Sequence, residues 1–157
     1  MTSLLPQSEM LPRVSEHWCL TKDGDPYCYE MARRHYSARH YRKQRRRLFV
    51  GPGRKLVLIA GDGKALFVWR KFIDGTQPAQ TGHNCAIFRN EGAVLSSQLI
   101  REAVAVVYDR WGRARCYTLV NAHKIKNQNP GCCFIKAGWR RCWTSKGGLM
   151  ILELLPE

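Results

Sequence analysis

The sequence predicts a single α/β domain in which helices flank a mixed β-sheet. Two apolar runs, at 55–60 and 65–70, are joined by Gly61-Asp62-Gly63-Lys64, which is a strong signal for a β-hairpin. Residues 98–111 carry apolar side chains at the three-to-four spacing of a helix, and strand-like runs lie on both sides of them. A hairpin followed by strand, helix and strand gives a mixed sheet with helices packed against it.

The helix expected at 98–111 is the best defined element. Ser96 or Ser97 is expected to cap its amino end, because a hydroxyl oxygen can accept from the first N–H groups. The apolar face is expected to consist of Leu99, Ile100, Ala103, Val104, Val107 and Trp111. The other side is expected to carry Arg101, Glu102, Ala105 and Asp109.

Turn residues and apolar runs predict the other elements. A helix over 27–36 follows the turn signal Asp23-Gly24-Asp25-Pro26. The run at 84–89 has a nearly continuous apolar centre, which is typical of a central strand. Further strands are expected at 116–120 and 149–155, and a short helix at 131–137.

Length and composition fit one globular domain. The chain has 157 residues, of which 45% are hydrophobic, and this is enough to bury a core without disulfides. Residues 1–14 are expected to form a loose leader and residues 15–157 the domain. No apolar run reaches about 18 residues, and the first residues do not resemble a signal peptide. We therefore expect a cytoplasmic protein that does not enter a membrane.

The seven cysteines include no Cys-x-x-Cys pair. An odd number of cysteines favours mostly buried thiols in a reducing compartment over a disulfide framework. A zinc site built from His17, Cys19, Cys28 and a distant ligand is the alternative, with a spacing unlike that of a zinc finger. We therefore expect no metal.

The formal net charge of +14 is concentrated in one segment. Residues 31–61 contain no acidic residue and hold ten of the 26 Lys and Arg residues, in a basic arm that spans 33–55. Such a segment attracts phosphate backbones, and its interleaved histidines and tyrosines can stack on bases. DNA is therefore the partner that we expect. A solubilising surface segment is the alternative.

The last third of the chain carries three short motifs, at Val120-Asn121, Asn129-Pro130-Gly131 and Gly138-Trp139. These motifs resemble those of the GNAT acyltransferases. Val120-Asn121 is similar to the strand that ends near an Asn in that family, and Asn129-Pro130-Gly131 to the start of its short helix. Gly138-Trp139 is similar to its Gly-aromatic pair, which precedes the last strands. With the order of the elements, the resemblance covers about residues 55–155. It implies a GNAT-like domain that transfers an acyl group from a small-molecule donor.

Five motifs follow one another along the chain: His35-Tyr36-Ser37, Phe88-Arg89-Asn90-Glu91, Ser96-Ser97, Asn129-Pro130-Gly131 and Thr144-Ser145-Lys146. In this order they give a narrower resemblance, to the Mom DNA-modification proteins of phages. This resemblance implies transfer of a small acyl-type group to the exocyclic amine of adenine, which protects phage DNA from restriction in the host cytoplasm. Two other functions stay open. One is CoA-dependent N-acylation of a protein or a small amine, and the other is nucleic-acid binding without catalysis.

Two positions depart from the acetyl-CoA-dependent members of the family. In those proteins the pyrophosphate lies on a glycine-rich turn at a helix amino end, where N–H groups and the helix dipole bind anions. Here the segment 89–97 has one glycine and carries Glu91, which we expect to repel a pyrophosphate. Phe134 stands where many members have a general-acid tyrosine. The donor is therefore open: acetyl-CoA bound in a different way, or another acyl or aminoacyl donor.

Three groups of candidate site residues follow. The catalytic candidates are Glu91, His35 and Tyr36, since a carboxylate, an imidazole and a phenol can exchange protons with an amine. The candidates for binding the donor are Asn90, Ser96, Ser97 and Asn129. The candidates for binding DNA phosphates are Arg39, Arg42, Arg45, Arg46, Arg47, Lys124 and Lys146.

Overall fold

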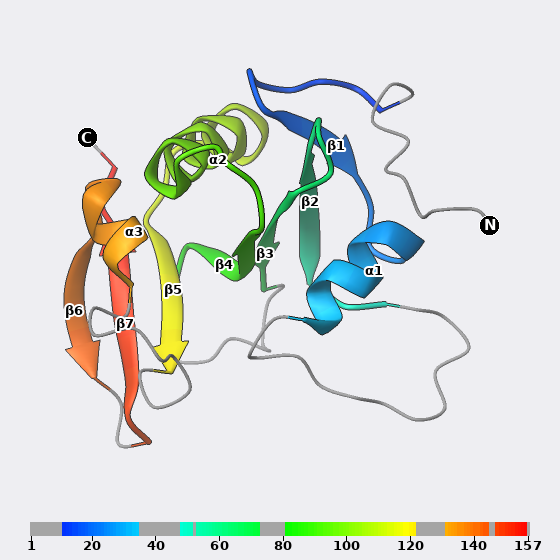
Figure 1. Ribbon diagram of the computed structural model, residues 1–157. Coiled ribbons are helices and arrows are strands. Elements are labelled where there is room, and N and C mark those ends of the chain that lie inside the picture. Colours follow the sequence, from blue (N-terminus) through cyan, green and yellow to red (C-terminus); the bar gives the residue numbers. More distant parts are fainter. Residues whose placement is uncertain are drawn as a thin grey trace.

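Figure 1 shows a computed structural model of the chain, which describes residues 11–34, 48–51, 53–72, 81–121, 131–144 and 147–156. Their elements are β1 (Trp18–Thr21), α1 (Pro26–Arg33), β2 (Arg54–Ala60), β3 (Ala65–Lys71), β4 (His83–Asn90), α2 (Ser96–Trp111), β5 (Cys116–Asn121), α3 (Cys132–Lys136), β6 (Arg140–Thr144) and β7 (Leu149–Leu154). The strands form one sheet in the order β1-β2-β3-β4-β5-β7-β6. Only β4 and β5 pair in parallel among these strands, so the predicted mixed α/β sheet is confirmed.

The sheet is covered by helices on both faces, because apolar side chains alternate along its strands. Leu58 and Phe67 belong to the cluster that packs under α2 and α3. Their neighbours Ile59 and Val68 belong to a second cluster, which includes Met31 of α1. Burying a side chain of this size stabilises the fold by about 1.5–3 kcal/mol.

Two tryptophans fix α2 on its face of the sheet. Trp18 and Trp69 are fully buried, and their indole N–H groups donate to helix carbonyls. Trp18 Nε1 lies 2.9 Å from Leu99 O, and Trp69 Nε1 lies 3.0 Å from Ala103 O. The two contacts are one helical turn apart, so they fix both the distance of α2 from the sheet and its rotation about its own axis.

The predicted helix at 98–111 and the predicted hairpin are confirmed, and two strands were not predicted. β1 has four residues, and all five residues of β6 are exposed. Neither segment shows the apolar alternation that indicates a strand. β6 forms because the backbone of β7 offers it a pairing edge. None of the helices in the described ranges is long and apolar enough to cross a membrane.

Two expectations about α2 are wrong. Its N-cap is Leu95, and neither Ser96 nor Ser97 caps the helix, because both already lie within it. Glu102 was expected on the outer side, but its side chain is only 16% exposed and accepts hydrogen bonds from Ser15 and His17. The segment before β1 covers this side of the helix.

Candidate functional site

β4 and β5 run side by side only over their first residues. The pairs are His83 with Cys116, Asn84 with Tyr117 and Cys85 with Thr118. Beyond Cys85 the register between β3 and β4 shifts, which leaves Ala86 without a partner on β3. Such a bulge bends a strand, and here it turns β4 away from β5.

The rest of β4, from Ile87 to Asn90, therefore pairs with β3 on one edge and with no described strand on the other. Ligands of α/β sheets bind outside the carboxyl ends of parallel strands, at the point where neighbouring strands separate. The end of β4 is therefore the place in this fold where a ligand is expected.

The segment 91–95 leads from β4 into the amino end of α2. No side chain caps this helix, since Leu95 holds the N-cap position and is 66% exposed. The first N–H groups of a helix need acceptors from outside it, and the helix dipole adds partial positive charge there. An anionic group is the ligand that suits this helix end.

Asn90 organises this segment. Its Nδ2 donates to Val94 O at 2.7 Å and to Ser96 Oγ at 2.9 Å. Its Oδ1 accepts from Gly92 N at 2.9 Å. The structure thus brings together three of the four donor-binding candidates, since Ser97 follows Ser96 in the first turn and is buried.

Glu91 is held between two arginines. Arg34 Nε lies 2.8 Å from Glu91 Oε2 and Arg34 Nη2 lies 3.0 Å from Oε1, while Arg89 Nε also donates to Oε2. The hydrogen bond from Arg34 is the largest cause that lowers the pKa of Glu91, to about 2. A carboxylate with so low a pKa is a weak proton acceptor, so the ion pairs disfavour the hypothesis that Glu91 is a base.

The expected repulsion between Glu91 and a pyrophosphate is offset by the same contacts. One carboxylate and two guanidinium groups leave one positive charge beside the segment 91–95. Arg89 Nη1 also donates to Arg34 O at 2.8 Å, which ties the end of α1 to the end of β4. Sequence reasoning missed Arg34 as a site residue, because its partner lies 57 positions away.

The remaining candidates fall outside the described residues. These are His35, Tyr36, Asn129, Arg39, Arg42, Arg45, Arg46, Arg47, Lys124 and Lys146. Their roles stay predictions. Phe134, which stands at the expected tyrosine position, is 6% exposed and packs edge-on against Phe88 and Trp139. It therefore belongs to the core.

A groove with a volume of about 590 Å³ borders the same segment. Its lining includes His17, Lys64, Asn90 and Gly92. His17 Nδ1 lies 2.6 Å from Glu102 Oε2, so the imidazole orientation is fixed by a carboxylate. Glu16, His17 and Glu102 lie close enough together to hold a metal ion. However, both oxygens of Glu102 already accept hydrogen bonds from the protein.

Comparisons with known proteins agree with this architecture. No protein-family model matches the chain, and no curated protein matches it. Among solved structures, a protein of Bordetella pertussis assigned to the GNAT acetyltransferases matches with a TM-score of 0.54 and 12% identity over 90% of this chain and 97% of its own. The GNAT domain of S. lividans PAT matches with a TM-score of 0.50 and 22% identity over 64% of this chain.

The chain spans 60% of that S. lividans domain. An aminoglycoside acetyltransferase solved with coenzyme A matches with a TM-score of 0.49 and 16% identity, over 64% of this chain and 66% of its own. At these identities the matches to the Bordetella pertussis protein and to the S. lividans domain establish the fold. The chain therefore has the fold of the GNAT acetyltransferases.

Proposed function

We propose that the chain transfers an acyl group from a coenzyme A thioester to an amine. The observation that carries the proposal is the separation of β4 from β5 directly before the uncapped amino end of α2. The free edge of β4 has backbone groups for the amide-containing arm of the donor, and the helix end suits its pyrophosphate. The bound donor supplies an activated thioester carbonyl.

Charge near this helix end supports an anionic donor. The two positive charges of Arg34 and Arg89 exceed the one negative charge of Glu91, which leaves a net charge of +1. These residues lie beside the segment that would hold the pyrophosphate. Asn90 fixes that segment through its contacts with Gly92 and Ser96. In the transfer, the amine nitrogen bonds to the thioester carbon, the carbon–sulfur bond breaks, and the thiolate takes up the proton that the amine loses.

The acceptor that we propose is the exocyclic amine of a DNA base, adenine. The support is the basic arm, with ten of the 26 Lys and Arg residues, and the resemblance of the ordered motifs to Mom proteins. Duplex DNA would have to expose the base from its stack before transfer. A protein or small-molecule amine is the alternative acceptor.

Calorimetric titration with coenzyme A tests the donor. Ser96→Glu places a carboxylate in the first turn of α2, where it favours the helix but repels an anion, so we expect affinity for coenzyme A to fall about tenfold. Ala105→Glu makes the same charge change at an exposed position in the middle of α2 and should have no effect. A protein that binds no coenzyme A would overturn the proposal.

Mass spectrometry of nucleosides tests the acceptor separately. DNA from cells that express the protein should contain an acylated adenine. Unmodified DNA together with acetyl-CoA-dependent acylation of other amines would reject DNA as the acceptor and leave acyl transfer in place.

A further inference from the structure

Basic side chains gather at the end of the sheet where β4 and β5 begin. β2 starts at this end, β3 finishes there, and α2 reaches it with its last turn. We call this region the basic end. It consists of Arg54, Lys55, Arg70, Lys71, Arg110, Arg113, Arg115, Arg140 and Arg141.

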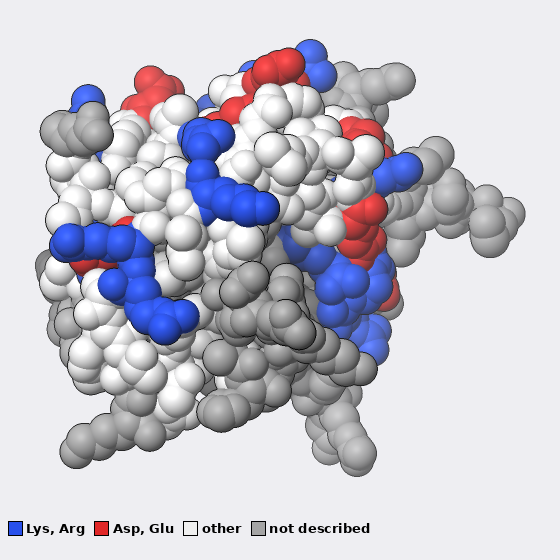
Figure 2. Space-filling view, turned by 60° about the vertical axis from the view of Figure 1, so that its left-hand side comes forward, with Lys and Arg blue, Asp and Glu red and all other residues white. Residues whose placement is uncertain are grey.

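Few carboxylates balance this charge. Within the described residues, the basic end has nine Lys and Arg residues and three acidic ones, Asp23, Asp109 and Glu153. The rest of the described chain has eight basic and six acidic residues. Figure 2 shows that on the side of β6 and α3 the charged side chains form separate groups with uncharged surface between them. The ratio of basic to acidic residues is therefore higher at the basic end than in the rest of the described chain.

Two pairs of these cations each act on one titratable side chain. Burial lowers the pKa of His83, and Arg54 and Lys71 lower it further. Burial raises the pKa of Tyr117, while Arg70 and Arg115 act in the opposite direction. His83 pairs with Cys116, and Tyr117 follows Cys116, so the side chains of His83 and Tyr117 lie on opposite faces of the sheet. Positive charge is therefore present on both faces at this end of the sheet.

Aromatic rings orient several of the guanidinium groups. Arg54 stacks on Trp111 with 5.1 Å between the guanidinium carbon and the ring centroid, and Arg113 stacks on Tyr108 at 5.5 Å. A stacked guanidinium uses its face for the ring and keeps its N–H groups along the edge for an acceptor. This arrangement suits phosphate oxygens, which accept in the plane of the guanidinium.

The length of the basic end indicates a repeating anion. Five strand spacings separate β2 from β6. At about 4.8 Å each they span about 24 Å, and duplex DNA carries about one negative charge per 1.7 Å of its axis. A duplex segment of this length carries about 14 phosphates on its two strands, and those that face the protein can meet this row of cations. We propose that the basic end binds the phosphate backbone of duplex DNA.

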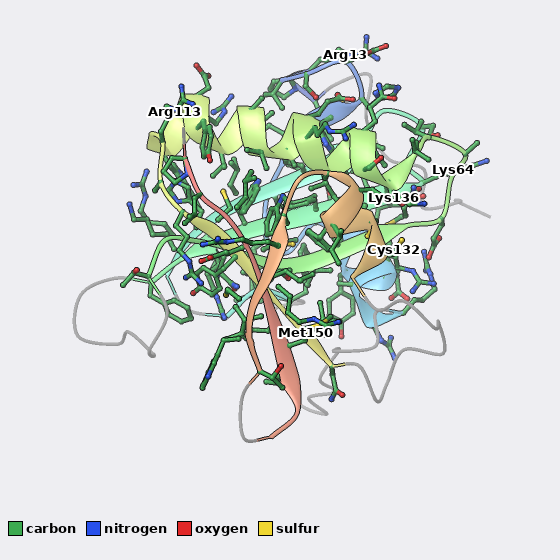
Figure 3. All side chains as sticks on the ribbon, turned by 90° about the vertical axis from the view of Figure 1, so that its left-hand side faces the viewer. Arg13, Lys64, Arg113, Cys132, Lys136 and Met150 are labelled. Carbon is green, nitrogen blue, oxygen red and sulfur yellow. The ribbon has the colours of Figure 1, made fainter. Side chains whose placement is uncertain are left out.

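This surface is distinct from the proposed donor site. In Figure 3 the labels Arg113 and Lys64 mark opposite ends of α2, and the proposed donor site lies at the Lys64 end. The basic end also differs from most of the basic arm, since only Arg54 and Lys55 belong to both. The proposal therefore holds whether or not a DNA base is the acyl acceptor.

Fluorescence anisotropy with a labelled DNA duplex of about 20 base pairs, at about 0.05 to 0.2 M salt, tests the proposal. The variant replaces three exposed residues of the basic end, as Arg110→Gln, Arg113→Gln and Arg141→Gln. The control makes the same charge change elsewhere, as Lys64→Gln, Arg101→Gln and Lys136→Gln. Thermal unfolding of both proteins establishes that the fold is intact, and coenzyme A titration of the variant establishes that its donor site is intact.

For the variant we expect the negative slope of log affinity against log salt to become shallower by about 3, which is about 0.9 for each lost phosphate contact. For the control we expect a change of less than about 1. An equal loss in both proteins, an unchanged slope in the variant, or a wild-type protein that binds only single strands would overturn the proposal. A wild-type protein that binds duplex DNA but no coenzyme A would reject the proposed acyl transfer and would leave the proposal for the basic end in place.

Discussion

Replacing Asn90 by Ala removes the side chain that holds the segment between β4 and α2. Three hydrogen bonds are lost, with donor–acceptor distances of 2.7 Å to Val94, 2.9 Å to Ser96 and 2.9 Å to Gly92. Each contributes about 1 kcal/mol, and water replaces part of this at a half-buried site, so the free energy of unfolding should fall by about 2–3 kcal/mol. In a domain of this size that corresponds to a Tm lower by about 4–12 °C.

The variant Asn90→Asp separates the structural role of Asn90 from the charge that the donor requires. An aspartate still accepts from Gly92 N, but it loses the two bonds that Nδ2 donates. Its carboxylate lies at the amino end of α2, which stabilises the helix by about 0.3–1 kcal/mol. We therefore expect Asp to cost less stability than Ala and to weaken coenzyme A binding more, because it repels the pyrophosphate.

Differential scanning fluorimetry and calorimetric titration of the two variants check both expectations. A Tm for Asn90→Ala within about 2 °C of wild type would contradict the role of Asn90 in holding the segment. Asn90→Asp with wild-type affinity for coenzyme A would show that no anion binds at this helix end.

Three further predictions concern stability and thiol access. Burial raises the pKa of Glu102, but hydrogen bonds from His17 and Ser15 outweigh it and lower this pKa below its usual 4.5. The contribution of Glu102 to the free energy of unfolding is therefore complete above pH 4.5 and is lost as the pH falls through the lowered pKa. Urea midpoints measured against pH should show this loss in the wild-type protein and a smaller loss in Glu102→Gln. Four of the seven thiols are buried, so a thiol reagent should modify at most three in the native protein and all seven after unfolding. Gly82→Ala should lower the Tm far more than Gly112→Ala, because a Cβ at Gly82 meets a backbone oxygen at 2.1 Å and one at Gly112 meets nothing within 4 Å.

Periodicity explains which elements were predictable. The spacing of apolar residues in α2 and the turn between β2 and β3 are local signals, and the structure places both elements within one or two residues of the prediction. β6 carries no such signal, because its residues are exposed and its conformation depends on pairing with β7. Strand preference reflects the neighbours of a segment more than its own sequence.

The candidate site was predictable where it is local in the sequence. Asn90 and Ser96 are six positions apart, and the short connection between β4 and α2 brings them together. The ion pair of Glu91 with Arg34 and the contact of Glu102 with His17 join residues 57 and 85 positions apart. Only the packing of α1 and of the segment before β1 onto the sheet creates these pairs, so no sequence pattern indicates them.

Glu91 can be assigned a role by a substitution that separates charge from catalysis. Glu91→Gln removes the carboxylate that pairs with Arg34 and Arg89, so the charge beside the donor segment rises from one positive charge to two. If Glu91 only pairs with these arginines, coenzyme A should bind more tightly and turnover should be retained, while the Tm falls because Arg34 loses its ion pair. If Glu91 also accepts the proton of the amine, turnover should be abolished although coenzyme A still binds. The pKa of about 2 favours the first outcome, since a carboxylate stabilised in its charged form by two guanidinium groups gains little from taking up a proton.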